Sequence, residues 1–230
     1  LAKRYQLPFV TTRFELGAGA SEDRAREVRY GFLTEQAAKY GATIATAHHA
    51  GDAVETVAIN ISRGTGWRGL AVLSREEIYR PLLSFTKSQL RDYANRARLE
   101  WVEDSTNQSD TYHRNRLRRK LTSLLAVSAA EQVMALRARQ LQLRRDIARE
   151  SAHVLAAHMG SRPFLTQIDD ATAVELLGYM VEKAGATRPT RPQLVRALHA
   201  VKTAKPGTSC QVGSGIELHF TARKFTVVVV

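Results

Sequence analysis

The segment ATIATAHHAGDAVETVAINIS, residues 42–62, places a short apolar run directly before a stretch with helical spacing. The run at 42–47 predicts a β-strand. The stretch from Asp52 to Ser62 predicts a helix, because its apolar side chains recur on one side. These side chains are Val54, Val57, Ala58 and Ile61. A strand followed directly by a helix is the repeating unit of α/β proteins.

The same alternation continues on both sides of this segment. Upstream, LPFVTTRFEL (7–16) is typical of a strand, and a helix is expected from Ser21 to Lys39, ended by Gly41. Downstream, IYRPLL (78–83) suits a further strand and residues 86–99 have helical spacing. The first part of the chain is therefore predicted to be an α/β domain with a parallel sheet.

The pattern changes near residue 125, where we predict a boundary between domains 1–125 and 126–230. One long helix is expected over 128–159, with an apolar stripe that includes Leu143 and Val154. Shorter helices are predicted around 170–184 and 191–202, followed by antiparallel strands that end in a buried TVVVV. Three cations fall on the side of the long helix opposite the stripe: Arg139, Arg145 and Arg149. The second domain is predicted to be small and α+β.

Charge points to a polyanionic partner. Lysine and arginine number 34 against 22 acids, a formal net charge of +12, which favours nucleic acid. An anionic membrane is the competing interpretation, but no expected helix combines a basic face with Trp or Phe anchors. No apolar run approaches the roughly 20 residues that span a bilayer. The lone Cys210 and an opening sequence unlike a signal peptide predict a reducing, cytoplasmic environment.

The motif HHAGDAVET (48–56) has three interpretations. A histidine metal site is disfavoured, because adjacent His48 and His49 point apart on any regular element. Asp52 with Glu55 three residues later resembles a capping box. The motif also follows a parallel strand, at the sheet edge where ligands bind and helix N-termini receive phosphate. The capping and ligand-binding roles can hold together.

Two further motifs are informative in opposite ways. GTGWRG (64–69) fits a dinucleotide-binding spacing, but it follows a helix instead of a strand, so we interpret Gly64 as a helix-ending glycine. YHRNRLRRKL (112–121) concentrates five cations without an acid. A solvated helix face is the simpler interpretation, but mutual repulsion favours an anionic partner.

In this order, the motifs resemble those of the tRNA(Ile)-lysidine synthase family of PP-loop ATP-pyrophosphatases. The likeness covers nearly the whole chain, including a C-terminal part from RPQLVRALHAV onward. Its earlier points are EDRAREVRY (22–30), TAHHAGDAVET (46–56), SRGTGWRGL (62–70), RPLL (80–83), WVEDSTN (101–107) and RNRLR (114–118).

The resemblance implies a reaction. With ATP and Mg²⁺, the family adenylates the C2 carbonyl oxygen of the wobble cytosine in an isoleucine tRNA with a CAU anticodon. The ε-amine of free lysine then displaces AMP. By likeness, the active-site candidates are His48, Asp52, Glu55, Arg114 and Arg118.

These residue types suit that chemistry. Arginines stabilise departing phosphoryl charge, a carboxylate holds the lysine ammonium or accepts its proton, and His48 or His49 assists deprotonation. The expected tRNA phosphate contacts are Arg116, Arg119, Lys120, Arg139, Arg145 and Arg149.

Two departures from the family pattern stand out. The family carries two acids in H-H-x-D-D-x-x-E-T, and the first is Gly51 here. The ATP signature S-G-G-x-D-S does not occur. In the family it follows a central strand that lies between strands like those at 8–16 and 42–47. We therefore expect that strand and loop upstream of Leu1, in a longer polypeptide.

Two alternatives to the synthase stay open. Another PP-loop tRNA modifier, such as a thiolase, usually recruits cysteines or a metal–sulfur centre, which a lone Cys210 disfavours. A non-catalytic tRNA-binding remnant is expected if the ATP loop is truly absent. A homodimer is also left open, because oligomeric state has no signature in this sequence.

Overall fold

The computed structural model describes residues 2–17, 19–102, 127–213 and 215–229. They form two compact units, Leu1–Ala138 (unit 1) and Arg139–Val230 (unit 2). The predicted domain boundary near residue 125 lies outside the described residues and stays a prediction. A parallel sheet, helices and a small antiparallel sheet are present, as the predicted α/β class with an α+β addition requires.

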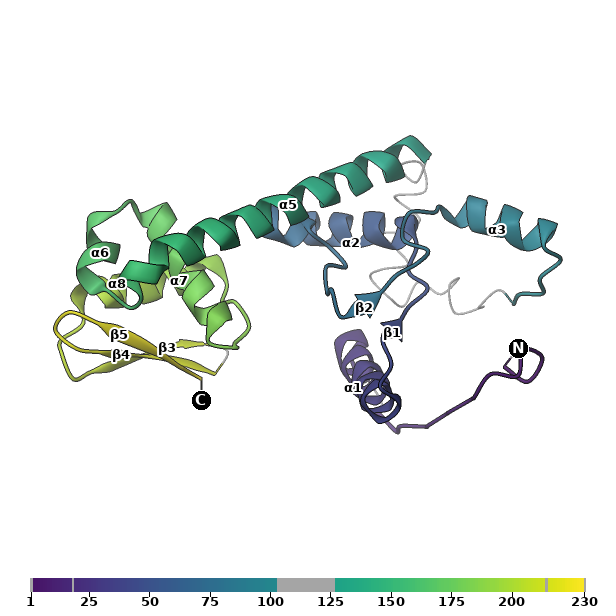
Figure 1. Cartoon of the computed structure of the whole chain (residues 1–230), viewed down its shortest axis with the longest axis horizontal. Helices are drawn as coiled ribbons and strands as arrows, with labels where there is room; N and C mark the ends of the chain where they lie inside the picture. The colour runs from purple at the N-terminus through teal and green to yellow at the C-terminus, as the bar shows by residue number, and fades with distance from the viewer. Residues whose placement is uncertain (1, 18, 103–126, 214, 230) are drawn as a thin grey trace. The chain divides into compact units, whose positions relative to one another are not determined.

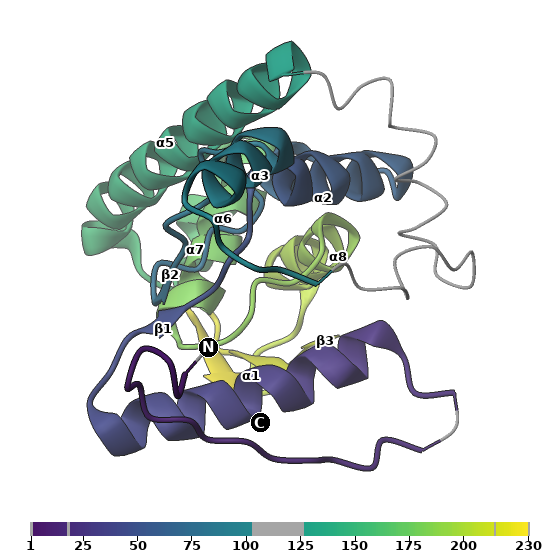
Figure 2. The same cartoon turned by 90° about the vertical axis from the view of Figure 1, so that its right-hand side faces the viewer.

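Unit 1 is built around two parallel strands. β1 pairs with β2 in the register Ile44 with Ile78 and Ala45 with Tyr79. Helices α1 and α2 lie on opposite sides of this pair (Figures 1 and 2), an arrangement typical of parallel sheets. The elements are α1 (Glu22–Tyr40), β1 (Ile44–Ala45), α2 (Ala50–Ser62), the 3₁₀ helix η1 (Trp67–Leu70), β2 (Ile78–Tyr79) and α3 (Lys87–Arg96).

The ends of α1 confirm the sequence signals. The Ser21 hydroxyl accepts a hydrogen bond from the Arg24 backbone N–H at 3.1 Å, and Gly41 follows the helix with φ +58°. An L-residue with a side chain avoids that left-handed conformation, so a glycine ends the helix there.

The predicted strand at 7–16 is wrong. Residues 8–16 form no ladder and are exposed, with Phe9 at 76% of its full accessibility. Figure 1 shows this part of the chain as an extended trace leading to α1. A strand needs a neighbour to pair its backbone N–H and C=O groups, and no described strand lies in register with it.

The core of unit 1 lies along α2. Ala53 and Val57 pack with Val72 and Leu83. On the same helix, Ala50 and Val54 contact Ala130, which belongs to the first turns of α5 (Val127–His158). The start of the long helix thus covers the buried face of α2, and the predicted helix over 128–159 is confirmed.

Unit 2 combines helices with the antiparallel sheet β3-β4-β5. Helices α6, α7 and α8 lie on one side of this sheet (Figure 1). The short α6 was not predicted. The elements that follow α5 are α6 (Arg162–Gln167), α7 (Asp170–Lys183), α8 (Arg191–Thr203), β3 (Ser209–Gly213), β4 (Ile216–Phe220) and β5 (Phe225–Val229).

The core of unit 2 is continuous from α5 to β5. Leu155, Leu177 and Leu218 are fully buried within it. Leu143 and Val154 are exposed, so the predicted apolar stripe of the long helix was too broad. The expectation of a buried terminal strand holds only in part. Phe225 is buried and Val227 packs against the core, whereas Val228 and Val229 are exposed.

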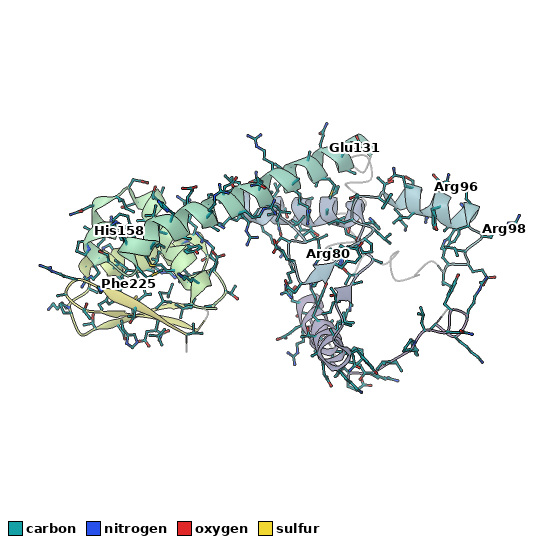
Figure 3. The ribbon with its side chains drawn as sticks, in the orientation of Figure 1. Arg80, Arg96, Arg98, Glu131, His158 and Phe225 are labelled. Carbon is teal, nitrogen blue, oxygen red and sulfur yellow. The ribbon has the colours of Figure 1, made fainter. Side chains whose placement is uncertain are left out.

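Two polar features fasten the turn between α5 and α6 to this core. The buried Arg162 guanidinium donates to three backbone carbonyls, those of Val201, Ala204 and Thr221. Gly160 has φ +68°, and its carbonyl accepts the Phe225 N–H at 2.9 Å. Phe225 and His158, the last residue of α5, are labelled in Figure 3.

Within the described ranges, no helix has the combined length and apolarity needed to cross a membrane.

Candidate active site

The predicted site lies where β1 leads into α2. The Thr46 N–H donates to the Tyr79 carbonyl at 2.9 Å, which extends the parallel ladder past both strands. The Ala50 N–H donates to the Phe85 carbonyl at 2.9 Å and joins the start of α2 to the loop before α3. The carboxyl ends of β1 and β2 therefore lie side by side, at the edge where α/β proteins bind ligands.

His48 occupies this edge. Its Nδ1 shares a 2.8 Å hydrogen bond with the Thr46 hydroxyl. This bond fixes the orientation of the ring. The ring is half-buried, so a substrate can reach it from solvent.

Asp52 caps α2, but differently from the prediction. The helix begins at Ala50, two residues earlier than expected, and the Asp52 carboxylate reaches back to accept the His49 backbone N–H at 2.8 Å. Glu55 takes no part in this cap. The capping-box pairing of Asp52 with Glu55 is therefore wrong, because the residue before the helix is His49.

The Asp52 carboxylate keeps capacity for a ligand. One oxygen, Oδ2, accepts the His49 N–H and lies 3.7 Å from His49 Nδ1. Among the described residues none donates to Oδ1, and a quarter of the side chain is exposed. A carboxylate can accept up to about four hydrogen bonds, so Asp52 can cap its helix and bind a cation at once.

Glu55 lies one turn further along α2, on its buried face. It is 3% exposed, and its neighbours Val54 and Ala53 belong to the core. A ligand arriving from solvent therefore meets Asp52 before Glu55.

Gly51 explains the position of the His49 ring. A Cβ on Gly51 would lie 2.7 Å from Cε1 and 3.0 Å from Nδ1 of His49. The missing side chain thus leaves room for this ring over the first turn of α2. An acid at this position, as the family pattern has, would require the ring to rotate.

Sequence reasoning missed two arginines behind this edge. Arg80 follows β2 directly, and its guanidinium donates to the carbonyls of Arg75 and Ile78 at 3.0 and 3.1 Å (labelled in Figure 3). Arg137, on α5, donates to the carbonyls of Val72 and Leu73 at 2.8 and 3.0 Å. Burial and the nearby Arg80 charge lower the pKa of Arg137. Arg80 could have been found from the sequence, because it begins the motif RPLL, whereas no motif includes Arg137.

Five of the predicted residues lie outside the described part of the chain: Arg114, Arg116, Arg118, Arg119 and Lys120. Arg139, Arg145 and Arg149 are exposed on α5, as expected. Arg149 pairs with Asp146 at 3.0 Å, and Arg145 donates to Gln142 at 2.8 Å. The roles of these residues in binding tRNA stay a prediction.

The glycine-rich loop after α2 has a structural role. Gly64 has φ +71° directly after the helix, which confirms it as the helix-ending glycine. The Asn60 amide donates to the Gly69 carbonyl at 2.6 Å and holds the loop against α2.

Comparison with known proteins agrees with this arrangement. Residues 1–125 match the PP-loop domain family. This chain belongs to the PP-loop family. The predicted resemblance to tRNA(Ile)-lysidine synthases is also confirmed, because curated proteins of that name are similar to most of the chain.

Three of these relatives illustrate the range. The chain is 33% identical to tRNA(Ile)-lysidine synthase of Pectobacterium atrosepticum over 219 residues, 88% of this chain and 50% of that protein. Identity to the Haemophilus influenzae 86-028NP protein is 29% over 89% of this chain and 51% of the relative. A Thermotoga maritima relative is 46% identical over 45% of this chain and 26% of its own length. The chain thus spans about half the length of the curated relatives that match most of it.

Proposed function

We propose that this PP-loop chain is part of an ATP-dependent ligase that joins lysine to C2 of the wobble cytidine in a CAU-anticodon tRNA(Ile). The observation that carries the proposal is the similarity of 88% of the chain to tRNA(Ile)-lysidine synthase. The geometry supports it, because the family motif forms a half-buried edge with an available carboxylate and a fixed histidine.

The two site residues have distinct roles in this proposal. The Asp52 carboxylate binds the ε-ammonium of substrate lysine through its Oδ1 oxygen and orients the nitrogen toward the base. His48, held by Thr46 at 2.8 Å, accepts the proton that the amine must lose before it attacks. The attack forms the C2–N bond and releases AMP from the adenylated base.

Within the described residues, no three acidic, histidine or cysteine side chains converge. We therefore assign the magnesium ion that accompanies ATP no step here.

In this proposal, exposed cations of α5 contact the phosphates of the tRNA. Arg139 and Arg145 project from this helix without an ion pair to any described residue. In a chain of net charge +12, such cations supply the sequence-independent affinity for phosphates.

A lysine-transfer assay tests the role of Asp52. Labelled lysine, ATP and a CAU-anticodon tRNA are incubated with the natural polypeptide that carries these 230 residues, and with its Asp52→Ala and Asp52→Asn variants. Both variants are expected to lose lysine transfer by about 100-fold, the scale of the loss when a reacting group is no longer positioned.

Asp169→Ala is the matched control. Asp169 caps α7 through the Ala171 and Thr172 N–H groups at 3.0 Å, and losing such a cap costs about 1 kcal/mol. This variant should lose similar stability and keep its lysine transfer. Full activity of a folded Asp52→Ala protein would leave that residue only its capping role.

A further inference from the structure

The motif EDRAREVRY (22–30) lies on α1 and has no part in the site described above. Its Tyr30 ring is approached by two guanidinium groups. Arg26 places Cζ 4.8 Å from the ring centroid and its Nη2 3.4 Å from the tyrosine hydroxyl. Arg75, from the loop before β2, places Cζ 5.7 Å from the same centroid. Two cations from separate elements thus share one aromatic ring.

In the part of the chain that the structure describes, nearby acids form no ion pair with these two cations. Among the described residues, neither Arg26 nor Arg75 forms an ion pair, whereas Arg24 of the same helix pairs with Glu27 at 2.6 Å. Glu76 and Glu77 follow Arg75 in the chain, but both are exposed and neither pairs with a described cation. Arg80 adds a further positive charge, because its guanidinium donates to the Arg75 carbonyl at 3.0 Å.

An aromatic ring orients a guanidinium group by attracting the planar face of the cation. This contact uses few of the N–H donors, since only Arg26 Nη2 donates to the Tyr30 hydroxyl, at 3.4 Å. The N–H edges of a guanidinium match the oxygens of a phosphate in a bidentate geometry. Neighbouring cations that form no ion pair also raise the local potential, which a polyanion relieves.

We propose that Arg26 and Arg75, held on Tyr30, form a phosphate clamp that grips the backbone of the RNA substrate. The inference rests on the proposed function and adds a contact on unit 1 to those expected on α5. An RNA fits better than an acidic protein segment, because the clamp offers paired planar donors suited to phosphate and the whole chain carries +12.

The salt dependence of tRNA binding tests the clamp. The affinity of the natural polypeptide for a CAU-anticodon tRNA is measured across a sodium chloride series. For the double variant Arg26→Gln/Arg75→Gln, the slope of log K against log salt should fall by about 1–2, since each phosphate contact contributes about 0.7–0.9.

Arg24→Gln is the matched control, because Arg24 lies on the same helix and is already paired with Glu27. Its slope should equal that of the parent protein. Thermal unfolding of each variant verifies that the loss is not one of folding.

Two Tyr30 variants test the role of the ring. Tyr30→Phe should bind like the parent, whereas Tyr30→Leu should keep the salt slope and lose about two- to five-fold in affinity, the scale of an exposed cation–π contact. A Tyr30→Leu protein that binds like the parent would contradict the clamp geometry.

The outcomes separate the clamp from the proposed function. A parent protein that shows no salt-dependent tRNA binding would overturn both. Parent binding with an unchanged slope in the double variant would overturn the clamp alone. If the double variant loses affinity for poly-glutamate but not for tRNA, the surface serves an acidic protein and the RNA clamp is also overturned.

Discussion

In unit 2, helices α5, α6, α7 and α8 and an antiparallel sheet enclose one continuous core that runs from Leu155 to Phe225. In unit 1, α2 buries two small clusters, and the apolar residues Phe9 and Phe14 of the N-terminal segment stay exposed. Burial of apolar surface is the main source of stability, so unit 2 should hold most of the stability of the chain. Unit 1 instead provides the edge at β1 and β2 where the candidate site lies.

Arg162→Met, in unit 2, is expected to have the largest effect on the stability of the chain. The substitution leaves the carbonyls of Val201, Ala204 and Thr221 without their buried donor. The free energy of unfolding should fall by about 3–5 kcal/mol, measured by urea denaturation. The exposed Arg196, changed to Met, should shift it by less than about 0.5 kcal/mol. Equal effects of the two changes would contradict the role given to Arg162.

Gly160→Ala should have the next largest effect and lower the free energy of unfolding by about 2–4 kcal/mol. The position has φ +68°, and a Cβ would collide with the Phe225 carbonyl oxygen of β5. Gly185→Ala separates the two causes, since Gly185 has φ +86° and no atom within reach of a Cβ. Gly185→Ala should lower the free energy of unfolding by only about 1–2 kcal/mol, the cost of the left-handed backbone conformation alone. Calorimetry that finds the same loss for both would contradict the close approach.

A matched pair of core truncations compares the units directly. Val181→Ala removes two carbons from the interior of unit 2, where the side chain is 1% exposed, and should cost about 2–3 kcal/mol. Val57→Ala acts in the thin core of unit 1 and should cost about 1–2 kcal/mol, because the site can collapse more easily. Chemical denaturation of both variants measures the difference, and a reversed order would contradict the contrast between the cores.

The smallest expected effect is a change in the pKa of Glu217, on β4 of unit 2. A hydrogen bond from the Ser209 side chain, and then one from His219, lower the pKa of Glu217. A carboxyl with a lowered pKa stabilises the fold above its unfolded pKa, and that contribution is lost as pH falls through the folded value. Ser209→Ala should raise the pKa of Glu217 toward its ordinary value, followed by carbon-detected NMR. An unmoved titration would show that Ser209 does not hold the carboxylate.

The sequence predicted well where the signal was local. The long helix α5 was placed within a residue at each end, because its spacing persists over 32 residues. Helix α1 begins after Ser21 and ends at Gly41, as expected. The strand at 7–16 was wrong, because a strand depends on a partner far away in the chain.

The candidate site was recovered unevenly for the same reason. His48 and Asp52 stood out because one motif holds them together. The start of α2 was misplaced by two residues, since Ala50 and Gly51 give no helix-start signal of their own. Arg137 could not be found, because its partners, the carbonyls of Val72 and Leu73, are more than 60 residues away.

Lysine transfer to two tRNAs that differ only at the wobble base tests the central claim most directly. With ATP and labelled lysine, the natural polypeptide should label the CAU-anticodon tRNA, release AMP in equal amount, and leave a UAU-anticodon version unlabelled. If the CAU tRNA binds and acquires no lysine, or if both tRNAs are labelled equally, the proposed function is contradicted.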